Sequence, residues 1–205
     1  ADLAAEEAAK LKLEGRTTDQ VQPAEQQPET DHKMQFERST TGNTNNVFFR
    51  EAQNGGWFSY ELATGGKTDI SLYLKYWGVD DWGTRRFEIF VDDEKLAEVN
   101  NSRRWRSSVF KTEEIRIPAS MVEGKKYITV RFQSSRGTQV GGIYEVRLVE
   151  PKPTVDVSME LTEPLKEELR DLWFTVKGAE LDWEATNNID EPSFQFHGSF
   201  NVINN

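Results

Sequence analysis

The chain has 205 residues, of which 36% are hydrophobic and 29% are charged, and its net charge at pH 7 is -10. This composition, with a mean hydropathy of -0.70, predicts no transmembrane span, and the length allows one large β domain or one domain with appendages. The sequence contains no cysteine, which excludes disulfides, cysteine-ligated zinc and thiol nucleophiles.

The charge is distributed unevenly along the chain. The net charge is -5 over residues 1–37, +3 over residues 38–149 and -8 over residues 150–205. Nucleic acid is a polyanion that would meet acidic ends and only a mild central excess of positive charge, so we expect no nucleic-acid partner. We expect three regions: an N-terminal helix and polar strap over 1–37, a β-sandwich domain over 38–150, and an acidic C-terminal extension over 151–205.

The N-terminal region begins with a good helix-forming composition. Leu3 to Leu13 is rich in Ala, Glu, Lys and Leu, and Gly15 is expected to end the helix. Thr17 to Met34 is polar and has neither a helical nor a strand period, which predicts an extended strap. Because Ala1 opens on acidic, Ala-rich sequence, we expect that a signal peptide either was never present or has been removed.

The middle region has the period of β-strands. Apolar residues alternate with polar or mixed ones over residues 70–77, and two further runs around Asp92 and Asp93 predict a β-hairpin. Because strands recur at short spacing without long helices between them, the fold class is all-β, an antiparallel β-sandwich or jelly roll. Further strands are expected at Ile115–Ile117, Tyr127–Phe132 and Ile143–Val149.

The C-terminal region offers weaker signals. A short helix is expected from Thr162, with Leu165, Leu169 and Leu172 at helical spacing. Strand-like runs follow at Trp173–Val176 and Ser193–Val202, and they either complete the sandwich or form a small appendage.

Most catalytic constellations are missing from the sequence. The only histidines are His32 and His197, which do not support a serine or cysteine triad. The acidic pairs Asp80-Asp81 and Asp92-Asp93 are adjacent in turns, whereas a glycosidase needs carboxylates that face each other across a cleft. We therefore expect the chain not to be an enzyme.

A cofactor is not expected either. A structural calcium ion prefers about six to eight oxygen ligands, which loops around Asp80, Asp81 and Glu145 would supply only in part.

The aromatic residues are the most informative feature. Seven of the 23 aromatics lie between residues 55 and 82, interleaved with Gly, Asp, Ser and Lys. Some of these, such as Phe58 and Tyr60, are expected in the core. Trp77, Trp82 and Trp105 lie at turn edges, where flat apolar rings beside polar groups suit sugar rings.

A basic cluster surrounds Trp105, formed by Arg103, Arg104 and Arg106. Guanidinium groups form bidentate hydrogen bonds with carboxylates, so the cluster is able to bind the uronic acids of an acidic glycan. Pairing with the acidic flanks of the same chain, or plain solvation, is the favoured alternative. The predicted carbohydrate-binding residues are Trp77, Trp82, Trp105, Arg104, Asp81 and Asn101.

Several segments together resemble a known family. The runs GWFSYEL over 56–62, FEIFVD over 87–92 and GGIYEVRL over 141–148 look like the C-terminal β region of bacterial β-L-arabinofuranosidase-type glycoside hydrolases, over roughly Gly15 to Val149. The resemblance implies a galactose-binding-like β-sandwich that normally follows a helical catalytic barrel. In that family the chemistry uses a cysteine nucleophile near zinc, so no catalytic residue carries over to this cysteine-free chain.

Two functional hypotheses follow. The first is a non-catalytic glycan-binding module of a bacterial polysaccharide-degradation system, located in the cell envelope, in the periplasm or at the outer membrane. The second is a structural or assembly module that docks onto a glycoside hydrolase or an outer-membrane glycan-uptake complex.

Overall fold

The computed structural model describes residues 3–152, 183–185 and 194–196. Contacts divide the chain into two compact units, Ala1–Lys152 and Pro153–Asn205. In the described part of the chain, no helix is long and apolar enough to cross a membrane. The first unit contains α1 (Leu3–Arg16), β1 (Thr17–Val21), α2 (Gln26–Asp31), β2 (Gln35–Thr44), β3 (Val47–Ala63), β4 (Ile70–Trp77), β5 (Arg86–Val91), β6 (Glu94–Asn100), β7 (Phe110–Ile117), α3 (Ala119–Val122), β8 (Tyr127–Gln133) and β9 (Glu145–Val149).

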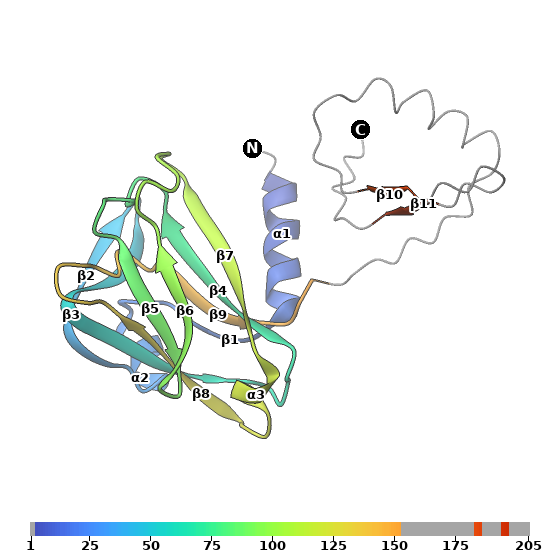
Figure 1. Cartoon of the computed structure of the whole chain (residues 1–205), viewed down its shortest axis with the longest axis horizontal. Coiled ribbons are helices and arrows are strands. Elements are labelled where there is room, and N and C mark those ends of the chain that lie inside the picture. The colour runs from blue at the N-terminus through green and yellow to red at the C-terminus, as the bar shows by residue number, and fades with distance from the viewer. Residues whose placement is uncertain (1–2, 153–182, 186–193, 197–205) are drawn as a thin grey trace. The chain divides into compact units, whose positions relative to one another are not determined.

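The first unit is an antiparallel β-sandwich (Figure 1). One sheet has the strand order β1-β9-β4-β7 and the other has the order β2-β3-β8-β5-β6, and all neighbouring strands run antiparallel. Many neighbours in the sheets are distant in sequence, which is typical of sandwich topologies. The predicted fold class is confirmed.

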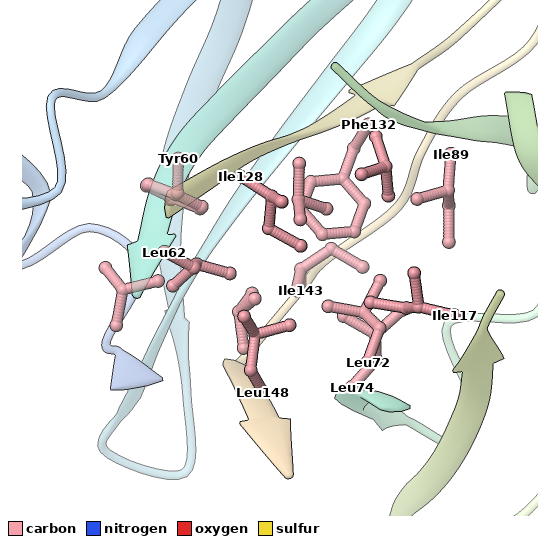
Figure 2. Packing of buried hydrophobic residues seen from close by; sticks show 14 of the residues in the cluster. Tyr60, Leu62, Leu72, Leu74, Ile89, Ile117, Ile128, Phe132, Ile143 and Leu148 are labelled. Atoms are coloured by element: carbon pink, nitrogen blue, oxygen red, sulfur yellow. The ribbon is translucent and has the colours of Figure 1, made fainter. Parts of the chain in front are cut away.

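The core lies between the two sheets and follows from the alternation of the strands (Figure 2). On β4 the inward residues Leu72 and Leu74 are fully buried, whereas Ser71, Lys75 and Trp77 keep part of their surface exposed. Residues of both sheets fill the space between them, so burial of one face of each strand holds the sandwich together. The fully buried side chains include Phe58, Tyr60, Leu62, Ile89, Phe132 and Ile143.

The predicted hairpin is confirmed as β5 and β6, which pair from Arg86 to Asn100. Asp92 and Asp93 form its turn, with φ values of 46° and 68°. Two consecutive left-handed residues are the conformation of a tight hairpin turn, and Asp tolerates that conformation better than most residues.

Helix α1 was predicted, but it extends past Gly15 to Arg16. The Thr17 hydroxyl donates to the Leu13 carbonyl over 2.7 Å, and the Arg16 side chain donates to both carboxylate oxygens of Glu114 on β7. These contacts satisfy a carbonyl of the last turn and attach the end of the helix to the sandwich, so glycine does not decide where the helix ends.

The segment 17–34 differs from the prediction, because it contains two regular elements. Strand β1 pairs with β9 at the edge of the four-stranded sheet, and Val21 is its only buried residue. One buried residue in five gives no readable period. The short helix α2 follows, and His32 at its end contacts the Pro28 carbonyl and the Asp19 carboxylate.

Strand β2 was also not predicted. It pairs with β3 along nearly its whole length, but none of its residues is buried. An edge strand that is solvated on both faces lacks the hydrophobic alternation that sequence reading depends on.

The second unit has a two-stranded sheet in its described residues, in which β10 (Trp183–Ala185) pairs antiparallel with β11 (Phe194–Phe196). Strand β11 falls within the predicted run 193–202. The predicted helix from Thr162 and the predicted strand Trp173–Val176 lie outside the described residues.

A buried ion pair joins α2 to the sandwich. Both carboxylate oxygens of Glu29 accept hydrogen bonds from Arg50 on β3, at 2.7 and 2.8 Å, and Glu29 also accepts the Tyr60 hydroxyl and the Ala24 N–H. Burial raises the pKa of Glu29, but the bonds from Arg50, Ala24 and Tyr60 outweigh it, so the pKa lies below the ordinary value of 4.5.

This lowered pKa predicts acid sensitivity. A carboxyl group whose pKa is lower in the folded state stabilises the fold above the unfolded pKa, and that contribution is lost as the pH falls through the folded pKa. We expect the melting temperature to fall as the pH decreases below about 4.5. In Glu29→Gln this dependence should be shallower. Thermal unfolding of both proteins across this range tests the prediction, and an equally steep dependence in the variant contradicts it.

Candidate functional site

Two loops interlock at one end of the sandwich, the loop 78–85 between β4 and β5 and the loop 101–109 between β6 and β7. The Gly78 N–H donates to the Val109 carbonyl over 2.9 Å, and the Asn101 N–H donates to the Arg85 carbonyl over 2.9 Å. A Cβ atom at Gly78 would clash with the carbonyl oxygen of Ser107, so only glycine allows this close approach. We call this pair of loops the loop end.

Asp81 holds the loop 101–109 in place. Its backbone carbonyl accepts the Arg103 N–H over 2.7 Å, and its carboxylate Oδ2 accepts the N–H groups of Trp105 and Arg106 at 3.2 and 3.1 Å. The structure therefore brings Asp81 and Trp105 together, as two of the six predicted binding residues. In this position Asp81 fixes the other loop, and its Oδ2 is already engaged.

Trp82 is the most exposed of the predicted tryptophans. Its side chain is 69% exposed. The residues on either side are fixed, because Asp81 accepts N–H groups of the loop 101–109 and the Gly83 carbonyl accepts the Ser102 hydroxyl over 3.0 Å. Val79 and Val109 add exposed apolar surface to the same two loops. Trp82 is thus an exposed ring on a constrained backbone.

Trp77 and Trp105 are only partly exposed. The Trp105 ring packs against Tyr76 with 5.4 Å between ring centroids, and the Arg104 guanidinium carbon lies 4.7 Å from its centroid. Trp77 makes an edge-to-face contact with Phe110 at 4.8 Å. Each of these rings already has an aromatic partner from the protein, which leaves less surface for a ligand than at Trp82.

Arg104 and Asn101 of the loop 101–109 belong to a hydrogen-bonded network that reaches β7. Arg104 donates to the Asn101 side-chain oxygen at 2.9 Å and to Glu113 on β7 at 2.7 Å, and Glu113 also accepts the Tyr76 hydroxyl at 2.6 Å. Burial, followed by the charge of Glu113, raises the pKa of Tyr76 well above its ordinary value. Asn101 is 3% exposed, so its side chain positions Arg104 through this hydrogen bond.

The basic cluster is not neutralised by the acidic flanks within the described residues. Arg104 pairs with Glu113, which belongs to the middle of the chain. Arg103 and Arg106 are exposed, and neither has an ion-pair partner in the part of the chain that the structure describes. Among the described residues, the guanidinium groups of Arg103 and Arg106 on the loop end therefore have no ion-pair partner, and they share the two loops with Trp82.

A third loop, 134–144 between β8 and β9, joins the loop end through Asp80. The Asp80 carboxylate pairs with the Arg85 guanidinium at 2.6 and 2.7 Å, and its other oxygen accepts the Gly142 N–H at 2.8 Å. Glu145, the third residue of the predicted partial calcium site, forms ion pairs with Lys75 at 2.9 Å and with Arg147. Among residues 3–152, no three carboxylate or histidine side chains gather in a way that would hold a metal.

A cleft of about 320 Å³ lies between the edge strands β6 and β7, beside the loop end. Arg104 and Glu113 line it together with Asn100. Sequence reading missed Asn100 and Glu113, because neither stands in a motif and only the meeting of the two sheet edges makes them neighbours.

A family model describes most of the first unit. It matches residues 12–149 and is described as a family of unknown function, DUF6805. The chain belongs to the DUF6805 family. The match leaves out most of α1 and the whole second unit, so the DUF6805 region coincides with the sandwich. No curated protein matches the chain.

Solved structures with partial similarity to this DUF6805 chain include two family 35 carbohydrate-binding modules. The module from Clostridium thermocellum is 7% identical, with a TM-score of 0.43, over 58% of this chain and 92% of that one. The module of Cellvibrio japonicus Abf62 is 12% identical, with a TM-score of 0.41, over 65% and 93%. A family GH115 4-O-methyl-α-glucuronidase is 15% identical, with a TM-score of 0.47, over 67% of this chain and 18% of that one. With TM-scores below 0.5, what this chain binds has to follow from its own residues.

Proposed function

We propose that this DUF6805 chain is a non-catalytic glycan-binding module and that the loop end is its binding surface. Trp82 carries the proposal, because a large aromatic side chain that is 69% exposed has no role in the core. Sugar rings present an apolar face of C–H groups, which stacks well on an indole.

The interlocked loops make this surface suitable for binding. The residues on both sides of Trp82 are tied to the loop 101–109 through Asp81 and Gly83. A ligand that stacks on Trp82 therefore has to order little of the backbone. Binding loses less conformational entropy than it would on a flexible loop.

The charge beside Trp82 favours an acidic glycan. The side chains of Arg103 and Arg106 are exposed without ion-pair partners among the described residues, and Arg104 lines the neighbouring cleft. A guanidinium group binds a carboxylate through two parallel hydrogen bonds, so we propose that the glycan carries uronic acids.

The biological setting belongs to the same proposal. The resemblance of residues 15–149 to the C-terminal region of β-L-arabinofuranosidase-type enzymes supports a place in a bacterial polysaccharide-degradation system, in the cell envelope. For the same reason we propose a glycoside hydrolase as a partner of this chain.

An assembly module is the second candidate. The exposed apolar side chains Val79, Trp82 and Val109 share the loop end, and such a group also suits a protein interface. In that case the partner would be a hydrolase or an outer-membrane complex, and aromatic stacking on a sugar would not be needed.

Calorimetry of the full chain against a panel of neutral and uronate-containing oligosaccharides tests the proposal. We expect Trp82→Ala to weaken binding at least about tenfold, since a stacked aromatic contributes on the order of 1 kcal/mol beyond its buried area. The control is Phe48→Ala, which removes another exposed aromatic, 46% exposed, outside the two loops. Equal affinity of wild type and Trp82→Ala would contradict the proposal, and so would a panel without a single binder.

A further inference from the structure

The outer face of the five-stranded sheet has a hollow at Ser59. Ser59 points outward from β3, because its neighbours Phe58 and Tyr60 are in the core, yet it is only 5% exposed. Strand register places Ser59 between Gln35 on β2 and Arg131 on β8. A small side chain surrounded by larger ones leaves a hollow of about 290 Å³. Its other lining residues are Gln35, Trp57, Asp92, Asp93, Thr129 and Arg131.

The Trp57 ring and the Arg131 guanidinium line the hollow together, and Arg131 also contacts Phe90, which lies outside the lining. The Arg131 guanidinium carbon lies 5.9 Å from the Trp57 ring centroid and 4.8 Å from that of Phe90. Arg131 donates to Asp93 over 3.1 Å, but its Nε–H is buried and has no acceptor among the described residues. A buried donor without a partner destabilises the fold, and a functional role is one explanation for keeping it.

The charges around the hollow cancel. Asp92 accepts hydrogen bonds from the Lys125 ammonium at 2.9 Å and from the Thr129 N–H at 2.8 Å, and Asp93 is paired with Arg131. Two carboxylates beside two cations leave no net charge to attract an anion. Asp93 is nevertheless 85% exposed and Gln35 is exposed as well, so acceptors and donors remain open to solvent.

We propose that this hollow is a second saccharide site, which binds a single neutral sugar ring. The partly exposed Trp57 offers an apolar surface, Asp93 accepts hydroxyl hydrogens, and Arg131 and Gln35 donate to hydroxyl oxygens. A hydroxyl group both donates and accepts, which matches this mixture better than a carboxylate or phosphate does. The volume of about 290 Å³ lies just below the range of roughly 300–1,000 Å³ for ligand pockets and suits one ring.

The hollow is separate from the loop end. Asp92 and Asp93 follow the last residue of β5, whereas the loop 78–85 precedes its first, and six strand residues span roughly 20 Å. This site therefore goes beyond the proposed function: the loop end takes an acidic unit and the sheet face a neutral one, and two sites of this kind favour a polymeric glycan through avidity.

Fluorine NMR of the full chain labelled with 5-fluorotryptophan tests the proposal, with the Trp57 signal assigned through Trp57→Phe. The probes are methyl glycosides of galactose, arabinose, xylose and glucose, with methyl glucuronide as the charged comparison. We expect the Trp57 signal to shift saturably with at least one neutral glycoside, both in wild type and in Trp82→Ala. In Ser59→Leu we expect this binding to be weaker by at least about tenfold, because the larger side chain occupies the hollow.

The matched control is Ser71→Leu, which enlarges an outward-facing serine of the other sheet and should leave the Trp57 titration unchanged. The proposal is overturned if no neutral glycoside shifts the Trp57 signal, if Ser59→Leu binds as well as wild type, or if methyl glucuronide binds at Trp57 more tightly than the neutral glycosides. If a neutral glycoside shifts the Trp57 signal and no glycoside, neutral or charged, shifts the Trp82 signal, the result supports the site at Ser59. The same result contradicts glycan binding at the loop end.

Discussion

Glu29→Ala is expected to lower the free energy of unfolding of the sandwich by about 3–5 kcal/mol. Glu29 is 4% exposed and Arg50 7% exposed, and the substitution leaves the Arg50 guanidinium buried without its carboxylate. The Tyr60 hydroxyl and the Ala24 N–H also lose their acceptor. Because typical domains are stable by about 5–15 kcal/mol, the loss is a large fraction of the whole. Urea unfolding followed by tryptophan fluorescence measures it.

Two further variants separate this cause from a general effect of losing a carboxylate. Glu61→Ala removes the partner of the exposed Lys33 and should change stability far less, because an exposed ion pair is largely solvated. The double variant Glu29→Ala/Arg50→Met removes the stranded charge and should recover part of the loss. Equal losses in Glu29→Ala and Glu61→Ala would contradict the account.

Asp80→Ala is expected to have the next largest effect, lowering the free energy of unfolding by about 2–3 kcal/mol. It breaks the ion pair with Arg85 that braces the loop 78–85, and it removes the acceptor of the Gly142 N–H, which joins this loop to the loop 134–144. The loss is smaller than at Glu29 because the two side chains are 18% and 12% exposed and stay partly solvated. Glycan affinity should fall with stability, since the loop that carries Trp82 is then less constrained.

Asp80→Asn isolates the charge in this contact. The amide oxygen still accepts the Gly142 N–H, so this variant should lose less stability than Asp80→Ala. If Asp80→Ala unfolds at the same urea concentration as wild type and binds glycan equally well, Asp80 does not organise the loop end.

Much of the fold could be predicted from the sequence because the inner strands bury one face. The alternation over β4 and the turn at Asp92 and Asp93 are patterns of neighbouring residues, and such local patterns can be recognised in a single sequence. Strands β1 and β2 lie at sheet edges, and of their residues only Val21 is buried. Their sequences therefore lack the alternation of apolar and polar residues that marks a strand. The pairing that makes them strands comes from β9 and β3.

The candidate site could be predicted only in part, for the same reason. The sequence pointed to Trp82 and Trp105 together, but it could not show that Trp105 packs on Tyr76 while Trp82 stays exposed. The role of Asp81 depends on backbone N–H groups more than twenty residues away in the chain. The hollow at Ser59 arises from the register of β2, β3 and β8 and from the turn after β5, which no local pattern encodes.

The central claim is that a sugar ring stacks on the Trp82 side chain. The most direct test replaces the Trp82 indole either by another aromatic ring or by an apolar side chain without a ring. For a glycan that binds the wild-type chain, calorimetry should show that Trp82→Phe keeps affinity within a few-fold, whereas Trp82→Leu loses at least about tenfold. Leucine preserves apolar character but has no aromatic face. Binding by Trp82→Leu as tight as that of wild type would contradict stacking and favour an apolar docking surface.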